Sequence, residues 1–229
     1  MRLMKTLVLA IATVGALSGC KNELVIDIDP SEKVTDAVVN SVRQATLSVE
    51  VTSCTDSDTG LDSKTLLEAK QKIPYVFKGA TFEKCKRVDY DNMAIFSVPV
   101  TYFPKDDVCE AESICVATLP EKDSKARLVL AAGKNVIEKY QKLQSNSALA
   151  SGANNRLVLR VKNSMKTDID AKMGAFIIKN QETKIPIYGD IVATIPAENM
   201  ALFQLPDVAS ETLLYHGRVV VGEFVYKSK

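Results

Sequence analysis

The stretch ATLSVEVTS, residues 45–53, decides the class of fold because its apolar and polar side chains alternate strictly. Ala45, Leu47, Val49 and Val51 would lie on one face of an extended chain, with polar side chains on the other. This period of two predicts a half-buried β-strand that ends at Cys54. A strand with one solvated face is typical of an antiparallel sheet.

Strand patterns also dominate the rest of the chain, and two segments have a clear helical pattern. The first helix is capped by Asp62 or Ser63 and ended by Pro74, and the second begins near Asn135. Residues 31–43 fit either a helix or a strand. The other expected strands are 24–28, 80–88, 93–103, 126–131, 157–161, 175–178, 187–195, 200–205 and 213–226. The sequence therefore predicts an α+β fold, with a mostly antiparallel sheet and two or three short helices.

Three regions are expected along the chain. Residues 1–19 have the composition of a signal peptide, residues 20–120 form a disulfide-containing α+β half, and residues 121–229 form a strand-rich α+β half. The boundary is placed at residues 119–125 because that stretch is polar and contains Pro120. Residues 145–155 have the composition of a loop.

The N-terminal region has the parts of a secretion signal. Arg2 and Lys5 supply positive charge, and the apolar run of residues 7–17 is too short to span a bilayer, which takes about 20 apolar residues. Leu17-Ser18-Gly19-Cys20 resembles the lipobox of bacterial lipoproteins, although an ordinary secretory signal is the alternative. The resemblance implies that Cys20 is lipidated and that the mature protein is held to a membrane outside the cytoplasm.

The residues after the lipobox bear on the destination. In the lipoprotein family an aspartate directly after the cysteine favours retention in the inner membrane, whereas here Lys21 and Asn22 follow. For a Gram-negative host, the resemblance therefore implies the outer membrane, with the folded part facing the periplasm. The formal net charge of the whole chain is only +1, and no basic cluster stands out, so a nucleic-acid partner is not expected.

Four cysteines remain after Cys20, which predicts two disulfides in an oxidising compartment. They are Cys54, Cys85, Cys109 and Cys115, and they allow three connectivities. We favour the pairs Cys54–Cys85 and Cys109–Cys115, because the second pair is close in sequence and the first ends two strand-like runs. Their spacing lacks the paired Cys-x-x-Cys of zinc sites, so no metal is expected.

Catalytic patterns are scarce in this sequence. His216 is the single histidine, and it is expected in a strand or turn; most general-base and catalytic zinc sites draw on imidazole. Asp56, Asp58 and Asp62 are spaced like part of a calcium loop, but turn and capping roles explain them more simply. We therefore expect no catalytic residue and no cofactor.

Two charged groups are candidate recognition surfaces. The first is the acidic loop of Asp106, Asp107, Glu110 and Glu112 around the expected Cys109–Cys115 ring, because a pinned loop loses little entropy on binding. The second is a basic strand face formed by Arg156, Arg160 and Lys162, which could meet an anionic ligand. A hairpin-fixing ring and a solvated strand face are the simpler interpretations of the two groups.

The mature part resembles uncharacterised lipoproteins encoded by phages and mobile elements. The resemblance rests on Val51-Thr52-Ser53-Cys54-Thr55-Asp56, on residues 66–77 and on Lys84-Cys85. It implies a role in excluding competing phages or plasmids, or in modifying the envelope. Our main hypothesis is a non-enzymatic binding or interaction module with an envelope protein partner; the alternatives are a structural subunit of an envelope assembly and a carboxylate-based hydrolase.

Overall fold

The computed structural model describes residues 21–32, 38–103, 108–146, 154–174, 177–180, 183–186 and 190–227. This part of the chain contains three helices, α1 (Lys64–Val76), α2 (Lys134–Asn146) and α3 (Asp207–His216). Its strands are β1 (Lys21–Ile28), β2 (Ser41–Val51), β3 (Thr81–Val88), β4 (Asp91–Tyr102), β5 (Ile114–Glu121), β6 (Lys125–Ala132), β7 (Asn154–Lys162), β8 (Ile169–Gly174), β9 (Ile177–Asn180), β10 (Thr183–Pro186), β11 (Asp190–Ile195), β12 (Met200–Gln204) and β13 (Arg218–Tyr226).

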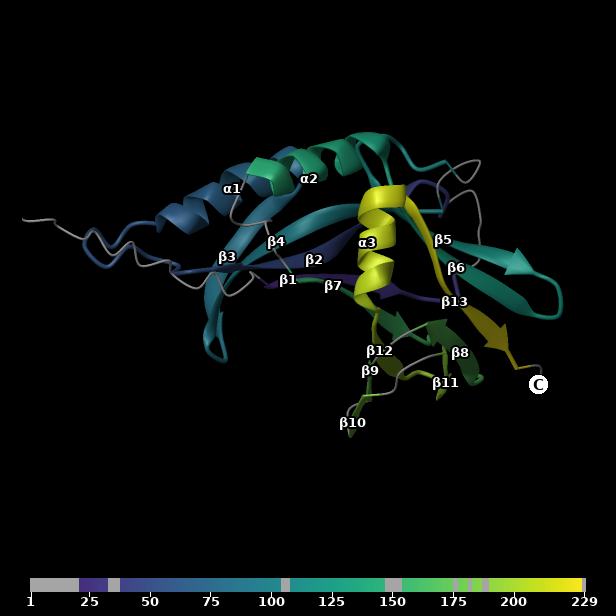
Figure 1. The fold of residues 1–229 in the computed structure, drawn as a ribbon. Helices are drawn as coiled ribbons and strands as arrows, with labels where there is room; N and C mark the ends of the chain where they lie inside the picture. The colour runs from purple at the N-terminus through teal and green to yellow at the C-terminus, as the bar shows by residue number, and fades with distance from the viewer. Residues whose placement is uncertain are drawn as a thin grey trace, which may run out of the picture.

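The strands form one curved sheet. Its order is β10-β9-β12-β7-β1-β2-β4-β5-β6-β13-β8-β11, and β3 pairs with β4 beside this path. Among the described pairings, β1–β7 and β4–β5 are parallel and the others are antiparallel, so the sheet is mixed. Figure 1 shows α1 and α2 above the sheet, with α3 crossing in front of it. The fold is α+β, as the sequence predicted, and its sheet is mixed, although most of the described pairings are antiparallel.

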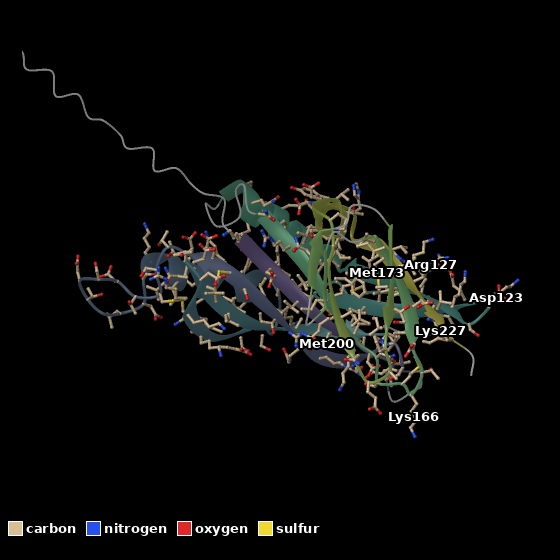
Figure 2. The ribbon with its side chains drawn as sticks, turned by 90° about the horizontal axis from the view of Figure 1, so that it is seen from below. Asp123, Arg127, Lys166, Met173, Met200 and Lys227 are labelled. Atoms are coloured by element: carbon tan, nitrogen blue, oxygen red, sulfur yellow. A yellow bond between two sulfur atoms is a disulfide. The ribbon has the colours of Figure 1, made fainter. Side chains whose placement is uncertain are left out.

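The expected boundary near residue 120 lies inside a β-hairpin. β5 and β6 pair along their length, from Ile114 opposite Ala132 to Glu121 opposite Lys125. Figure 2 shows Asp123 at the tip of this hairpin and Lys227 at the same end of the molecule. The two proposed halves also share the parallel β1–β7 pair and one main hydrophobic core. Pro120 therefore lies in β5, residues 122–124 form the turn, and the stretch chosen as the boundary lies within a continuous sheet.

Helix α1 begins as the sequence predicted and ends later. The Ser63 hydroxyl accepts a hydrogen bond from the Leu66 N–H at 3.2 Å, which caps the first turn. One face of the helix packs into the core through Leu66, Ala69, Ile73 and Val76. Pro74 was expected to end the helix but lies inside it. A proline this close to the C-terminal end removes one donor without interrupting a long helix, so the last turn can close to Val76.

The sequence analysis missed helix α3. Residues 213–226 were expected to form one strand, but α3 extends to His216 and β13 begins at Arg218. Gly217 separates them with a left-handed backbone (φ 78°), and its N–H bonds to the Leu213 carbonyl at 3.0 Å. His216 is thus the last helical residue rather than part of a strand. β5, β8 and β10 were also missed.

Both disulfides are present in the pairing that the sequence favoured. Cys54 is bonded to Cys85, which ties the loop before α1 to strand β3. Cys109 is bonded to Cys115, which closes a short ring at the start of β5. No helix in the described part of the chain is both long and apolar enough to cross a membrane.

Candidate functional site

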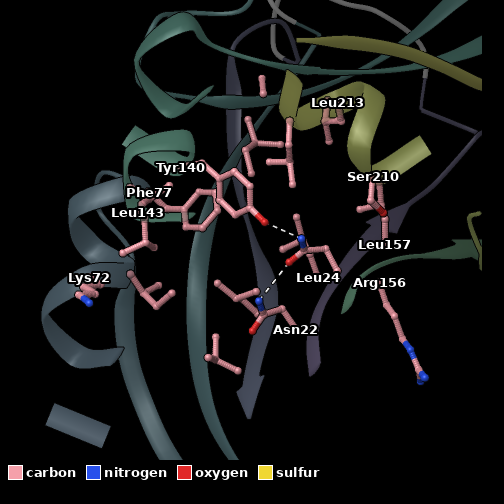
Figure 3. A pocket seen from close by; sticks show the side chains of 18 residues that line it. Asn22, Leu24, Lys72, Phe77, Tyr140, Leu143, Arg156, Leu157, Ser210 and Leu213 are labelled. Carbon is pink, nitrogen blue, oxygen red and sulfur yellow. Dashed lines mark hydrogen bonds between the residues drawn. The ribbon is translucent and has the colours of Figure 1, made fainter. Parts of the chain in front are cut away.

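A cavity of about 80 Å³ lies where the three helices meet the sheet. Figure 3 shows its lining, which is largely apolar and comes from segments far apart in the sequence. The helices contribute Ile73, Val76, Leu143, Leu213 and Leu214, and the residue after α1 contributes Phe77. The strands contribute Leu24, Leu47, Val49, Ile114, Ala132 and Leu157. The space lies between the helical layer and the inner face of the sheet.

One end of the cavity is polar. The Asn22 side-chain amide donates to the Asn155 Oδ1 at 3.0 Å, and the Asn155 amide donates to the Tyr140 hydroxyl. The dashed lines in Figure 3 follow this chain from Asn22 to Tyr140. Gln144 also donates to the Tyr140 hydroxyl at 3.2 Å and accepts a hydrogen bond from Tyr215 at 2.6 Å. The network joins β1, β7, α2 and α3.

Two buried oxygen atoms at the cavity have no hydrogen-bond partner among the described residues. They are the Oδ1 of Asn22 and the Oγ of Ser210, whose side chain is buried on α3. If both side-chain amides of Asn22 and Asn155 are flipped, so that their oxygen and nitrogen atoms exchange places, the Tyr140 hydroxyl donates to Asn155. Asn22 then directs an N–H group, rather than its oxygen, to the unpartnered side. The polar end can therefore offer either an acceptor or a donor to a bound group.

Charged groups contribute little to the interior of the cavity. Arg156 borders it, but in Figure 3 its side chain extends away from the other lining residues. Lys72 forms an ion pair with Glu68 on the same helix. Burial raises the pKa of the Tyr140 hydroxyl, so this group stays neutral near pH 7. The site is thus suited to an uncharged, apolar group.

The size of the cavity limits what can enter. A cavity of about 150 Å³ holds one benzene molecule, and pockets for drug-sized ligands are typically about 300–1,000 Å³. A space of about 80 Å³ can take an apolar side chain or the end of an acyl chain. The geometry therefore fits partial insertion of a larger partner rather than enclosure of a whole small molecule.

The expected recognition loop has a structural role at the start of α2. The Ala111 carbonyl accepts hydrogen bonds from the backbone N–H groups of Asn135 and Val136. Glu112 accepts from the Asn135 side chain at 2.7 Å and pairs with Lys139 at 2.9 Å. The Lys139 hydrogen bond, then that of Asn135, lowers the pKa of the Glu112 carboxyl.

The members of that loop therefore differ in what they can do. Glu112 is committed to α2, whereas Glu110 is exposed. Asp106 and Asp107 lie outside the described residues. The loop supports the start of α2 through Glu112 and offers Glu110 to solvent.

The other acidic loop is organised by its own backbone. Asp56 accepts hydrogen bonds from the N–H groups of Asp58 and Thr59, and Asp62 forms an ion pair with Lys70. Within the described ranges, no group of three or more metal-binding side chains comes together. Asp56 thus has the turn role that its spacing suggested, whereas Asp62 pairs with Lys70 and the cap of α1 is Ser63.

The basic strand face is present on β7. Arg156, Arg160 and Lys162 lie on one face of the strand together with Val158, and none of the three charged residues is buried. Arg160 pairs with Asp27 on the neighbouring strand at 3.2 Å. The face is a partly paired, solvated surface, and the cavity lies on the opposite side of the strand, beside Asn155 and Leu157.

Cys20 lies outside the described residues, but the next residue, Lys21, is held by two contacts. The Lys21 ammonium pairs with the Asp91 carboxylate at 2.6 Å, and the Lys21 backbone N–H donates to Glu50 at 2.9 Å. The predicted anchor would therefore leave the domain beside the start of β4.

Sequence reasoning gave no role to Tyr140, Asn155 or Ser210. The sequence placed residue 155 in a loop, whereas β7 begins at Asn154 and gives Asn155 an inward position in line with Leu157 and Leu159. A polar residue in such a row is unusual and marks a buried network or site. Ser210 had no such signal, because α3 itself was not expected.

A family model described as a domain of unknown function, DUF7424, matches residues 27–225. The chain belongs to the DUF7424 family. The matched range begins within β1 and ends within β13, so it includes all three helices. A comparison with curated proteins gives no match.

Proposed function

We propose that this DUF7424 protein is a lipid-anchored envelope lipoprotein that acts as a non-enzymatic binding module, with the cavity beneath the helices as its binding site. The observation that carries the proposal is the coincidence of apolar walls with two buried oxygen atoms that have no hydrogen-bond partner in the described part of the chain. Such atoms normally find a partner in a folded protein, so a site that leaves them open is prepared for a bound group.

The proposed partner is an envelope protein that inserts an apolar side chain into the cavity. The inserted side chain would fill the void, and its insertion would bring a polar group of the partner within reach of Asn22 or Ser210. The anchor on Cys20 keeps the module at the membrane surface, where such partners are concentrated. In this proposal the protein is held at the outer membrane, faces the periplasm and serves envelope modification or exclusion encoded by a mobile element.

The carboxyl groups with shifted pKa values do not support a carboxylate-based hydrolase. Hydrogen bonds, from the Thr59 N–H to Asp56 and from the Thr194 side chain to Asp170, lower the pKa of both groups. A general acid at neutral pH needs a raised pKa. A binding role therefore fits these groups better than an acid–base role.

Site-specific photocrosslinking in intact cells tests the binding site. A photoreactive phenylalanine analogue at Leu143, on the cavity wall, should form a crosslinked product with a partner. Ser210→Leu should abolish that product because the leucine fills the cavity. Glu211→Leu is the matched control, since it adds the same side chain to an exposed position of the same helix. If the product survives Ser210→Leu, or no product forms, the cavity is not the binding site.

A further inference from the structure

The turn between β3 and β4 exposes an aromatic side chain. Tyr90 is 88% exposed, and Val88 beside it is 40% exposed. The connection consists of Asp89 and Tyr90, and Asp89 has a left-handed backbone (φ 54°), which aspartate tolerates in tight turns. We call residues 86–90 the hairpin tip.

The hairpin tip lies next to the point where the chain leaves for the predicted anchor. Lys21 directly follows Cys20, and its ammonium lies 2.6 Å from a carboxylate oxygen of Asp91, the residue that follows Tyr90. Consecutive Cα atoms are about 3.8 Å apart, so a lipid on Cys20 would start within one residue of this contact. The anchor and the tip therefore share one end of the domain.

We propose that the hairpin tip contacts the bilayer that holds the anchor, with Tyr90 at the lipid–water interface. This inference rests on the lipid anchoring in the proposed function and adds an orientation to it. Tyrosine suits the interface because its ring is apolar and its hydroxyl remains hydrated. Within the tip, Lys86 and Arg87 are exposed on β3, and their charge suits anionic head groups.

A solvated tip is the competing interpretation. β3 lies at an edge of the sheet, and exposed charges on such strands prevent pairing with other chains. A single exposed aromatic residue is also common on protein surfaces. The membrane interpretation differs because it requires Tyr90 to be shielded from water only when the protein is anchored.

Tryptophan fluorescence distinguishes the membrane interpretation from the solvated one. Because the natural chain contains no tryptophan, a single introduced tryptophan reports on its own position. The full-length gene carrying Tyr90→Trp is expressed, and the processed protein is reconstituted into phosphatidylcholine–phosphatidylglycerol vesicles whose acyl chains are brominated. Bromine quenches tryptophan only in close contact. The expected result is a blue shift relative to detergent-free protein lacking the anchor, together with loss of emission in brominated but not ordinary vesicles. Val88→Trp provides a second reporter at the tip and should behave in the same way.

Tyr215→Trp is the matched control, because Tyr215 is a half-exposed tyrosine on α3, away from β3 and β4. Its emission should be the same in both kinds of vesicle. If the protein floats with the vesicles while positions 88 and 90 stay unquenched, the tip does not touch the bilayer, and the inference is overturned with anchoring intact. If the protein does not float with the vesicles, anchoring fails, and the inference fails with it.

Discussion

Replacing Ser210 with leucine should stabilise the protein, which is an unusual expectation for a buried position. Ser210 lies on the inner face of α3 and is 5% exposed, and its hydroxyl has no hydrogen-bond partner among the described residues. The neighbouring space is lined mainly by apolar side chains. Leucine would remove the unpaired hydroxyl and occupy part of that space.

The expected change in the free energy of unfolding is the sum of two stabilising contributions and one destabilising contribution. Empty core volume costs about 24 cal/mol per Å³, so complete filling of about 80 Å³ would contribute about 2 kcal/mol. Removing a buried unpaired polar group contributes about 1–3 kcal/mol. Strain from an imperfect fit opposes these gains by about 1–3 kcal/mol. We therefore expect the free energy of unfolding to rise by about 1–2 kcal/mol.

Urea denaturation under identical conditions measures this change, provided that the m value is the same for both proteins. The control Glu211→Leu should change the free energy of unfolding by less than about 0.5 kcal/mol, because Glu211 is exposed. A loss of stability greater than about 1 kcal/mol for Ser210→Leu would refute the reasoning, since it would mean that the space is too small or too rigid to accept the side chain.

Three other predictions concern the disulfides, the proposed anchor and the start of α2. Replacing Cys54 and Cys85 with serine should cost about 4 kcal/mol of unfolding free energy, and replacing Cys109 and Cys115 about 2 kcal/mol, because the loops span 31 and 6 residues; denaturation of both variants checks the order. Cys20→Ser should remove the acyl mass seen by intact-mass measurement of the wild-type protein, and a wild-type protein without acyl mass would contradict the proposed anchor. Glu112→Ala should lower the melting temperature at pH 7 while Glu110→Ala leaves it unchanged, because only Glu112 bonds to α2. The pKa of Glu112 is lowered in the folded protein, so its contribution to stability is fully present above the pKa of the unfolded chain, about 4.3, and is lost as the pH falls through the lower pKa of the folded protein. Equal melting temperatures of the two variants at pH 7 would contradict this role of Glu112.

Local patterns in the sequence were sufficient where neighbouring residues decide the structure. Strict alternation in residues 45–53 predicted β2, and Ser63 before an apolar face predicted the start of α1. They failed where two local signals compete, as in residues 213–226, which are rich in strand-forming valine. There Gly217 divides the run into the end of α3 and the start of β13.

The candidate site required the tertiary structure. Asn22 and Asn155 are 133 positions apart and meet only because β1 pairs in parallel with β7. Strand order depends on packing between distant segments, which short-range periodicity does not contain. The same holds for the pairing of Lys21 with Asp91, which sets the predicted anchor beside the hairpin tip.

The sequence by itself determined the α+β class and most of the strands, because these depend on residue type at short spacing, and it favoured the cysteine pairing that the structure has; the lipid anchor stays a prediction. Only the tertiary structure decided that both halves share one mixed sheet, that Glu112 supports α2, and that a cavity remains beneath the helices. The physical reason is that a cavity is what remains after side chains from many elements have packed together. Its volume depends on the position of every surrounding element and not on any one stretch of chain.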